Sequence, residues 1–364
     1  MNQEQLTTIF RDTHAAAEQG DAIAQNDLGE MYDHGRGVAQ DGAQALAWYR
    51  KAADQGYAPA QYNLGAMYYY GRGIARDDAQ AVAWFRKAAD QGHARAQLRL
   101  GEIYEYGLGI ARDSAQAIAW YHKAADQGYA GAQYNLGWIY RFDFGLGVAQ
   151  DDAQAVAWYR KAADQRDAGA QFNLGVMYDN GQGVPQDDAQ ALAWYRKAAD
   201  QGHAGAQFNL GLMYKNGQGV PQDDTQAVAW YRKAADQGDA DAQNNLGLMY
   251  KNGQGVPQDD AQAVAWFRKA ADQGDAYAQF NLGVMYYYGR GIAPDYAQAI
   301  AWYRKAADQG YTRAQFNLGL MYKNGQGVAR DDAQAIAWFR KAADQGDANA
   351  QEMVRKMEAS GTGP

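Results

Sequence analysis

The sequence contains no cysteine, which excludes both a disulfide framework and a thiolate zinc site. Serine is almost absent as well. It occurs only as Ser114 and Ser360, and neither begins a Ser-x-x-Lys motif or lies within Gly-x-Ser-x-Gly. The histidines are scattered, and none forms the His-x-x-x-His pair that places two metal ligands on one helix face. We therefore expect no enzyme activity, no cofactor and no bound metal.

The sequence also lacks long apolar runs and long runs of basic residues. No apolar run approaches the length of a membrane-spanning helix. The formal net charge is −8 and no long basic run occurs, so we expect neither nucleic-acid binding nor membrane insertion. Residues 1–20 lack the apolar core of a signal peptide, which predicts a cytoplasmic protein as the sequence is written. A periplasmic or secreted location stays open if a signal has been removed.

The chain contains instead a repeat of 36 residues, of which residues 203–238 are a representative copy. Tryptophan marks the period, at Trp48, Trp84, Trp120, Trp158, Trp194, Trp230, Trp266, Trp302 and Trp338. The fourth copy has 38 residues and ends in Arg166, where the others have a glycine that suits left-handed backbone. A fixed period of this length is typical of a solenoid, so we expect one elongated array.

Each copy is expected to form two antiparallel helices. In residues 203–238, small and apolar residues recur at helical spacing on both sides of a loop that contains glycine and proline. Asn216-Gly217 ends the first helix, Asp223 caps the second, and Gly238 follows it. One hairpin cannot bury its apolar stripe alone, so neighbouring copies must stack. The expected fold is all-α, an α-solenoid of antiparallel helix hairpins that forms a right-handed superhelix.

Two motifs carry a resemblance to a known family. Leu210-Gly211-x-x-Tyr214 and the following Ala227-x-x-x-Tyr231-x-x-Ala234 resemble the tetratricopeptide pattern. The longer Gly-x-Gly-Val-Pro loop and the 36-residue period are similar to the Sel1-like repeat (SLR) subclass. The resemblance covers residues 21–346 in nine copies, which begin at residues 21, 57, 93, 129, 167, 203, 239, 275 and 311. We expect a capping helix in residues 1–20, and a capping helix and tail in residues 347–364.

The resemblance implies a non-enzymatic scaffold or adaptor that binds a protein or peptide in a concave groove lined by the first helices. Because several secreted relatives of the family contain disulfides, the lack of cysteine favours a reducing compartment. Three alternatives stay open. One is an immunity or inhibitor protein that neutralises a toxin or effector. Another is a β-lactam-binding relative, against which the missing serine motif argues, and the third is a consensus-like designed array, suggested by the near-identity of the copies.

The copies differ mainly at positions 3, 6, 10, 13 and 14, counted from the first residue of each copy, and all five lie in the first helix. These spacings place the five positions on one helix face, which we name the variable stripe. The second helices hardly vary, and almost all carry a pair such as Arg232-Lys233 with Asp236 four residues after the arginine. We interpret this pair as an exposed face partly neutralised by the aspartate, with a basic ridge as the alternative. The exposed Arg-Lys positions hardly vary from copy to copy, so exposure alone does not explain the variation on the stripe. We therefore interpret the variable stripe as a surface that recognises a partner.

Seven aromatic residues lie on the variable stripe of copies two to four, and Phe144 lies in the adjoining insertion of the fourth copy. Exposed aromatic clusters are typical binding anchors, so we predict the main partner contact there, with Trp138 at its centre. The predicted residues are Tyr62, Tyr69, Tyr70, Tyr106, Tyr134, Trp138, Arg141, Phe142 and Phe144.

A second predicted set lies in copies six, seven and nine. It consists of Lys215, Asn216, Lys251, Asn252, Lys323 and Asn324. We predict that these residues bind an acidic segment or a free carboxylate, as lysine and asparagine do in related peptide clamps. Each asparagine also precedes a glycine at a helix end, so helix capping is the alternative.

Overall fold

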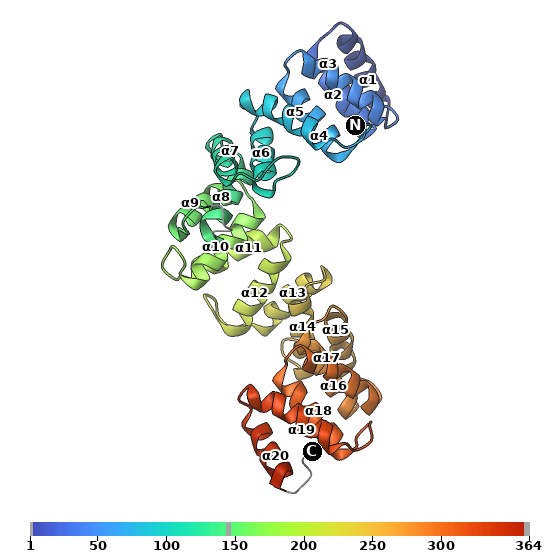
Figure 1. The fold of residues 1–364 in the computed structure, drawn as a ribbon, viewed down its shortest axis with the longest axis vertical. Coiled ribbons are helices and arrows are strands. Elements are labelled where there is room, and N and C mark those ends of the chain that lie inside the picture. The colour runs from blue at the N-terminus through green and yellow to red at the C-terminus, as the bar shows by residue number, and fades with distance from the viewer. Residues whose placement is uncertain (1–2, 143–146, 360–364) are drawn as a thin grey trace. The chain divides into compact units, whose positions relative to one another are not determined.

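The computed structural model describes residues 3–142 and 147–359, and all regular secondary structure in these residues is α-helical (Figure 1). The chain divides into two compact units, residues 1–186 and 187–364. The N-terminal unit contains α1 (Gln3–Glu18), α2 (Ala22–His34), α3 (Gly42–Asp54), α4 (Ala58–Tyr70), α5 (Asp78–Asp90), α6 (Ala94–Tyr106), α7 (Ser114–Asp126), α8 (Ala130–Phe142), α9 (Asp152–Asp164) and α10 (Ala168–Asn180). The C-terminal unit contains α11 (Asp188–Asp200), α12 (Ala204–Asn216), α13 (Asp224–Asp236), α14 (Ala240–Asn252), α15 (Asp260–Asp272), α16 (Ala276–Tyr288), α17 (Tyr296–Asp308), α18 (Thr312–Asn324), α19 (Asp332–Asp344) and α20 (Ala348–Ala359).

Within each unit, consecutive helices pack against one another as antiparallel hairpins, which confirms the predicted all-α solenoid. The superhelical hand stays a prediction. The helix ends follow the expected chemistry: Asp223 accepts a hydrogen bond from the backbone N–H of Gln226 at 3.0 Å, and Gly217 has a φ of 69°. Arg166 has a φ of 68°, so it adopts the left-handed conformation that glycine takes at the ends of the other copies.

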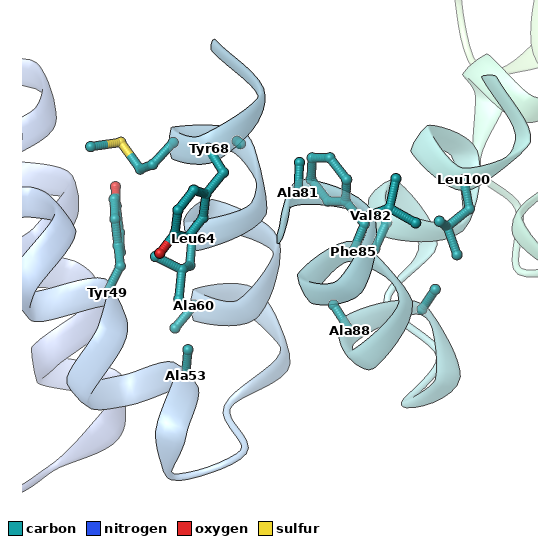
Figure 2. Close-up of a cluster of buried hydrophobic side chains, with 14 of the residues drawn as sticks. Tyr49, Ala53, Ala60, Leu64, Tyr68, Ala81, Val82, Phe85, Ala88 and Leu100 are labelled. Carbon is teal, nitrogen blue, oxygen red and sulfur yellow. The ribbon is translucent and has the colours of Figure 1, made fainter. Parts of the chain in front are cut away.

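In the copies that lie within one unit, a glycine of the first helix lets an aromatic ring of the second helix pack directly on the helix backbone. A Cβ atom on Gly211 would lie 2.5 Å from the ring of Tyr231, which is fully buried. Figure 2 shows the corresponding cluster in the N-terminal unit, to which Leu64 of α4, Phe85 of α5 and Leu100 of α6 contribute. The core is therefore continuous from copy to copy, as expected for a solenoid.

Buried glutamines connect neighbouring copies. The Nε2 atom of Gln61 donates to the backbone oxygen of Ala53 at 3.2 Å, and its Oε1 atom accepts from Gln91 at 2.7 Å. Gln207 makes the same two contacts in the C-terminal unit. Because a buried amide needs partners for both of its ends, this network explains why glutamine recurs at this position.

The Arg-Lys pair of the second helices has a structural role that we did not predict. Arg232 donates to the hydroxyl of Tyr250 on the first helix of the next copy, and the Nζ atom of Lys233 lies 3.8 Å from the centroid of the Trp230 ring. Arg232, Lys233 and Asp236 are exposed, as expected, but in the described residues Asp236 forms no contact ion pair with Arg232. These contacts explain why the pair does not vary. Its constancy therefore gives no support to a partner-binding role for the variable stripe.

Candidate functional site

Four of the predicted aromatic residues are exposed. They are Tyr70 at the end of α4, Tyr106 at the end of α6, and Trp138 and Phe142 on α8, and we name them the exposed aromatic set. Their exposed fractions are 53%, 66%, 37% and 41% respectively. Other copies have histidine, asparagine or alanine at some of these positions and form the same helices, so the fold does not require these rings.

The other predicted aromatic residues are half-buried and pack between helices. The Tyr62 ring lies 5.6 Å from that of Phe85 and 5.1 Å from that of His93. Tyr134 packs on Tyr159 in the same way, with ring centroids 5.8 Å apart. These two rings fill space between a first helix and its neighbours, so only part of each is available to a partner.

Tyr69 and Arg141 are half-buried as well. The Tyr69 ring contacts that of Tyr70 at 5.0 Å, and the guanidinium of Arg76 lies 5.5 Å from its centroid. Arg141 donates to Asn173 at 3.0 Å and to Gln182 at 3.2 Å, so it connects α8 to the next copy. Phe144 lies outside the described residues.

Two members of the exposed aromatic set, Tyr106 and Trp138, line two adjacent hollows on α6 and α8. The larger has a volume of about 490 Å³ and is lined by Glu105, Tyr106, Arg112 and Trp138. The smaller, of about 120 Å³, shares three of these residues, and its lining is Glu102, Glu105, Tyr106, Tyr121, Asn135, Trp138 and Ile139. The Trp138 and Phe142 rings lie 4.5 Å apart, so the two side chains form one continuous apolar surface at the hollow.

Two glutamates of α6 take part in different interactions. Glu102 accepts from Arg99 at 2.6 Å, and Arg99 also donates to the Tyr70 hydroxyl at 2.8 Å. The Tyr121 hydroxyl donates to Oε2 of Glu105 at 2.5 Å. Burial, and then this bond to Glu105, raise the pKa of Tyr121, so the phenol stays protonated and remains a donor. Burial and Glu105 also raise the pKa of Tyr106.

Glu105 and Arg112 were not among the predicted site residues. Glu105 lies on the variable stripe, so its position could have been found from the sequence, but its role depends on the hollow beside it. Arg112 lies in the loop after α6, and no periodic pattern places that loop beside Trp138.

The predicted lysines of the C-terminal unit lie near the ends of three different helices. Lys215, Lys251 and Lys323 are half-buried, and none of them forms an ion pair within the described residues. The adjacent asparagines are exposed and point to their own loops: Asn216 donates to Gln218 at 3.5 Å, and Asn252 donates to Gln254 at 3.4 Å. Asn324 contacts Gln326 in the same way, at 3.5 Å. These local contacts agree with the capping alternative for the asparagines.

Burial, and then the nearby charge of Arg290, lower the pKa of Lys251. Its site therefore has two neighbouring cations. In the described part of the chain, no helix combines the length and the apolar character that crossing a membrane requires, and no three metal-ligating side chains are grouped together.

Comparison with known proteins identifies the repeat. The family model described as the Sel1 repeat matches residues 22–57, 58–93, 94–129, 130–167, 168–203, 204–239, 240–275, 276–311 and 312–347. These segments begin one residue after the copies defined from the sequence. No curated protein sequence gives a significant match.

Solved structures agree with this result. A protective antigen of uropathogenic Escherichia coli strains, which has an SLR fold, is 43% identical with a TM-score of 0.86, over 96% of this chain and 74% of that one. A Sel1 repeat protein from Oxalobacter formigenes is 37% identical with a TM-score of 0.64, over 85% of this chain and 89% of that one. An immunity protein of Pseudomonas aeruginosa has a TM-score of only 0.37 at 22% identity, over 59% of this chain and 81% of that one, and carries no argument. The repeat matches and the two closely similar structures together place this chain in the Sel1 repeat family.

Proposed function

We propose that this chain is a non-enzymatic scaffold that binds a protein or peptide segment on its first-helix face, with the exposed aromatic set as the main contact. Sel1 repeat proteins are generally scaffolds for protein–protein interaction. The supporting observation is the position of Tyr106 and Trp138, two exposed rings that border a hollow. Large aromatic side chains bury much area at a small entropic cost, and they are enriched among the residues that dominate binding energy.

The alternative explanation for the variable stripe is drift at exposed positions. Drift replaces exposed residues mostly by polar ones, because an exposed apolar ring gains nothing from solvent. Copies two to four instead carry four exposed rings on three consecutive first helices. Among them, Trp138 contacts Phe142 and lines a hollow together with Tyr106. An exposed apolar patch of this kind is typical of an interaction site.

The test is quantitative affinity capture from the native host with three forms of the chain. These forms are the wild type, Trp138→Ala and Ile9→Ala, which removes an exposed apolar side chain from α1 of the same unit, outside the variable stripe. We expect a partner that the wild type and Ile9→Ala retain equally and that Trp138→Ala loses. A partner captured equally by all three forms would place the contact elsewhere. A single toxin bound one to one would instead support the inhibitor alternative.

A further inference from the structure

We infer that the hollow on α6 and α8 binds a lysine or arginine side chain of the bound polypeptide, with Glu105 as counter-ion and Tyr106 and Trp138 as walls. This inference rests on the proposed function and adds the chemistry of the partner. It comes from three observations: an internal comparison of position 13, the fixed orientation of the Glu105 carboxylate, and the exposed rings that flank it.

Position 13 holds an acidic residue in the first, third and fifth copies, namely Asp33, Glu105 and Asp179. The carboxylates of the first and third copies differ in their partners. In the first copy, Asp33 accepts from Arg72, which lies in the loop of the next copy, at 3.0 Å. In the third copy, the acid is Glu105, and the residue that corresponds to Arg72 in the next copy is Leu146. The arginine that pairs with Asp33 in the first copy is therefore replaced by an uncharged residue at the corresponding position of the sequence after Glu105.

The carboxylate of Glu105 is held in place at the hollow. The donor to its Oε2 atom, the Tyr121 hydroxyl, belongs to a fully buried side chain, and this contact fixes the carboxylate. In the described residues, Glu105 forms no ion pair, although Arg112 lines the same hollow. Arg99, the nearest basic residue on α6, is already paired with Glu102.

The two walls of the hollow suit a cation. An ammonium or guanidinium group is attracted to the face of an aromatic ring. The chain itself uses this geometry throughout its second helices, for example where the Nζ atom of Lys51 lies 3.7 Å from the Trp48 centroid. Tyr106 and Trp138 line the hollow beside Glu105, so both rings lie next to a carboxylate.

An apolar side chain is a less favourable occupant of this hollow. Covering Glu105 with apolar atoms would remove its water without replacing the lost hydrogen bonds, which is strongly unfavourable for an ion. A cationic side chain replaces that water with a charge-assisted hydrogen bond and buries its methylene stem against the two rings. Charge complementarity therefore favours a basic residue over an apolar or acidic one.

The experiment selects peptides from a phage-displayed random 12-residue library on the wild-type chain, with counter-selection on Trp138→Ala. We expect the retained peptides to be enriched in lysine or arginine at one position. Synthetic peptides are then titrated against Glu105→Gln, which keeps an acceptor oxygen for Tyr121, and against Glu18→Gln, a control at an exposed carboxylate on α1, outside the variable stripe. Glu105→Gln should weaken binding about tenfold, as expected for a hydrogen bond between charged groups, whereas Glu18→Gln should not. Circular dichroism confirms that both variants are folded.

A second set of peptides, with norleucine in place of the basic residue, completes a double-mutant cycle. These peptides should bind the wild-type chain about tenfold more weakly, and Glu105→Gln should then have no further effect. Peptides that require Trp138 but show no enrichment in basic residues, or that bind Glu105→Gln as tightly as wild type, overturn this inference alone. If no selected peptide requires Trp138, the proposed function fails as well.

Discussion

The Nη1 atom of Arg72 lies 3.0 Å from the Oδ2 atom of Asp33, and this contact joins the loop after α4 to the end of α2. The Asp33 side chain is only 7% exposed, so its carboxylate depends on this one arginine for a counter-ion. Arg141 with Gln182, and Tyr287 with Gln326, connect the same two positions of neighbouring copies. Position 13 of the variable stripe therefore takes part in stacking the copies as well as in forming the surface.

The first prediction concerns that contact. Arg72→Ala should lower the free energy of unfolding of the N-terminal unit by about 1–3 kcal/mol, because it leaves a buried carboxylate without its partner. Arg36→Ala is the control, since Arg36 lies 3.9 Å from Glu30 in an exposed pair and should contribute less than about 1 kcal/mol. Urea denaturation measures both, and hydrogen exchange in α2 locates the change. Equal losses in the two variants would contradict the prediction.

The second prediction concerns Arg166, which has a φ of 68°. A residue with a Cβ atom is strained in this conformation by roughly 1–2 kcal/mol, while glycine is not. Arg166→Gly should therefore stabilise the chain, by about 0.5–1 kcal/mol after the greater freedom of glycine in the unfolded chain is subtracted. Gly128→Ala makes the opposite change at the end of the third copy, where φ is 84°, and should destabilise. Thermal unfolding midpoints that move in the same direction for both variants would contradict this.

The third prediction is a pH dependence at the start of α6. The Nδ1 atom of His93 caps this helix by accepting from the Ala96 N–H at 3.3 Å, which requires a neutral ring. Burial, and then the charge of Arg95, lower the pKa of His93 below its ordinary value of 6.5. Because the folded-state pKa is lower than the unfolded one, the stability that this cap contributes is present above pH 6.5 and is lost as pH falls through the folded-state pKa.

Replacement by aspartate tests this mechanism. Asp167 caps α10 at the same position of its copy, with its carboxylate accepting from Ala170 at 2.8 Å. His93→Asp should therefore keep the cap, worth about 1 kcal/mol, and remove its dependence on pH between roughly 7 and 5. Thermal unfolding of both forms at several pH values measures the difference. If wild type and variant lose stability in parallel as the pH falls, His93 is not the group that titrates.

The fold could be predicted from sequence because every copy repeats the same local requirements. Gly211 must lack a Cβ atom to admit Tyr231, and Asp223 must cap α13, and both patterns recur at fixed intervals. The sequence did not predict which aromatic residues of the variable stripe are exposed and which pack between helices. Tyr62 and Tyr106 both lie on the variable stripe, but Tyr62 packs on Phe85 while Tyr106 stays exposed, and this depends on three-dimensional neighbours.

Contacts between copies were the other feature that the sequence did not predict. A helical pattern relates Arg232 to Asp236 four residues later, whereas its partner in the fold is Tyr250, on the next copy. The ion pair between Asp33 and Arg72 was not predicted for the same reason, because the two residues belong to different copies and are far apart in the sequence. Spacing within one helix can show which face a residue occupies, but not which residue of the next copy meets it.

The fourth prediction concerns the lysine set of the C-terminal unit. If this region binds an acidic segment, as the sequence predicts, Lys251→Glu should weaken binding of an acidic peptide, and added salt should weaken binding to the wild type. Lys251 is the most informative position, because burial and the neighbouring Arg290 lower its pKa and an anion would relieve the repulsion between the two cations. Asn252→Ala is the control, since Asn252 contacts Gln254 in its own loop. If the affinity for the acidic peptide changes neither with Lys251→Glu nor with added salt, the prediction is wrong, and these lysines and asparagines have only local structural roles.

The last prediction separates a binding tryptophan from a structural one. Trp120 is 6% exposed in the second helix of the third copy, and Trp138 is 37% exposed on the first helix of the fourth. Trp120→Ala should destabilise the chain by about 3–5 kcal/mol, the usual cost of removing a large aromatic side chain from a core. Trp138→Ala should keep the helical circular dichroism signal and lose much less stability, but it should cost about 2 kcal/mol or more of partner binding if Trp138 is the centre of the contact. Thermal unfolding and calorimetric titration with a bound peptide measure the two effects separately. If Trp138→Ala unfolds the chain as Trp120→Ala does, while its folded fraction binds the peptide with wild-type affinity, the ring serves the core and the exposed aromatic set is not the binding surface.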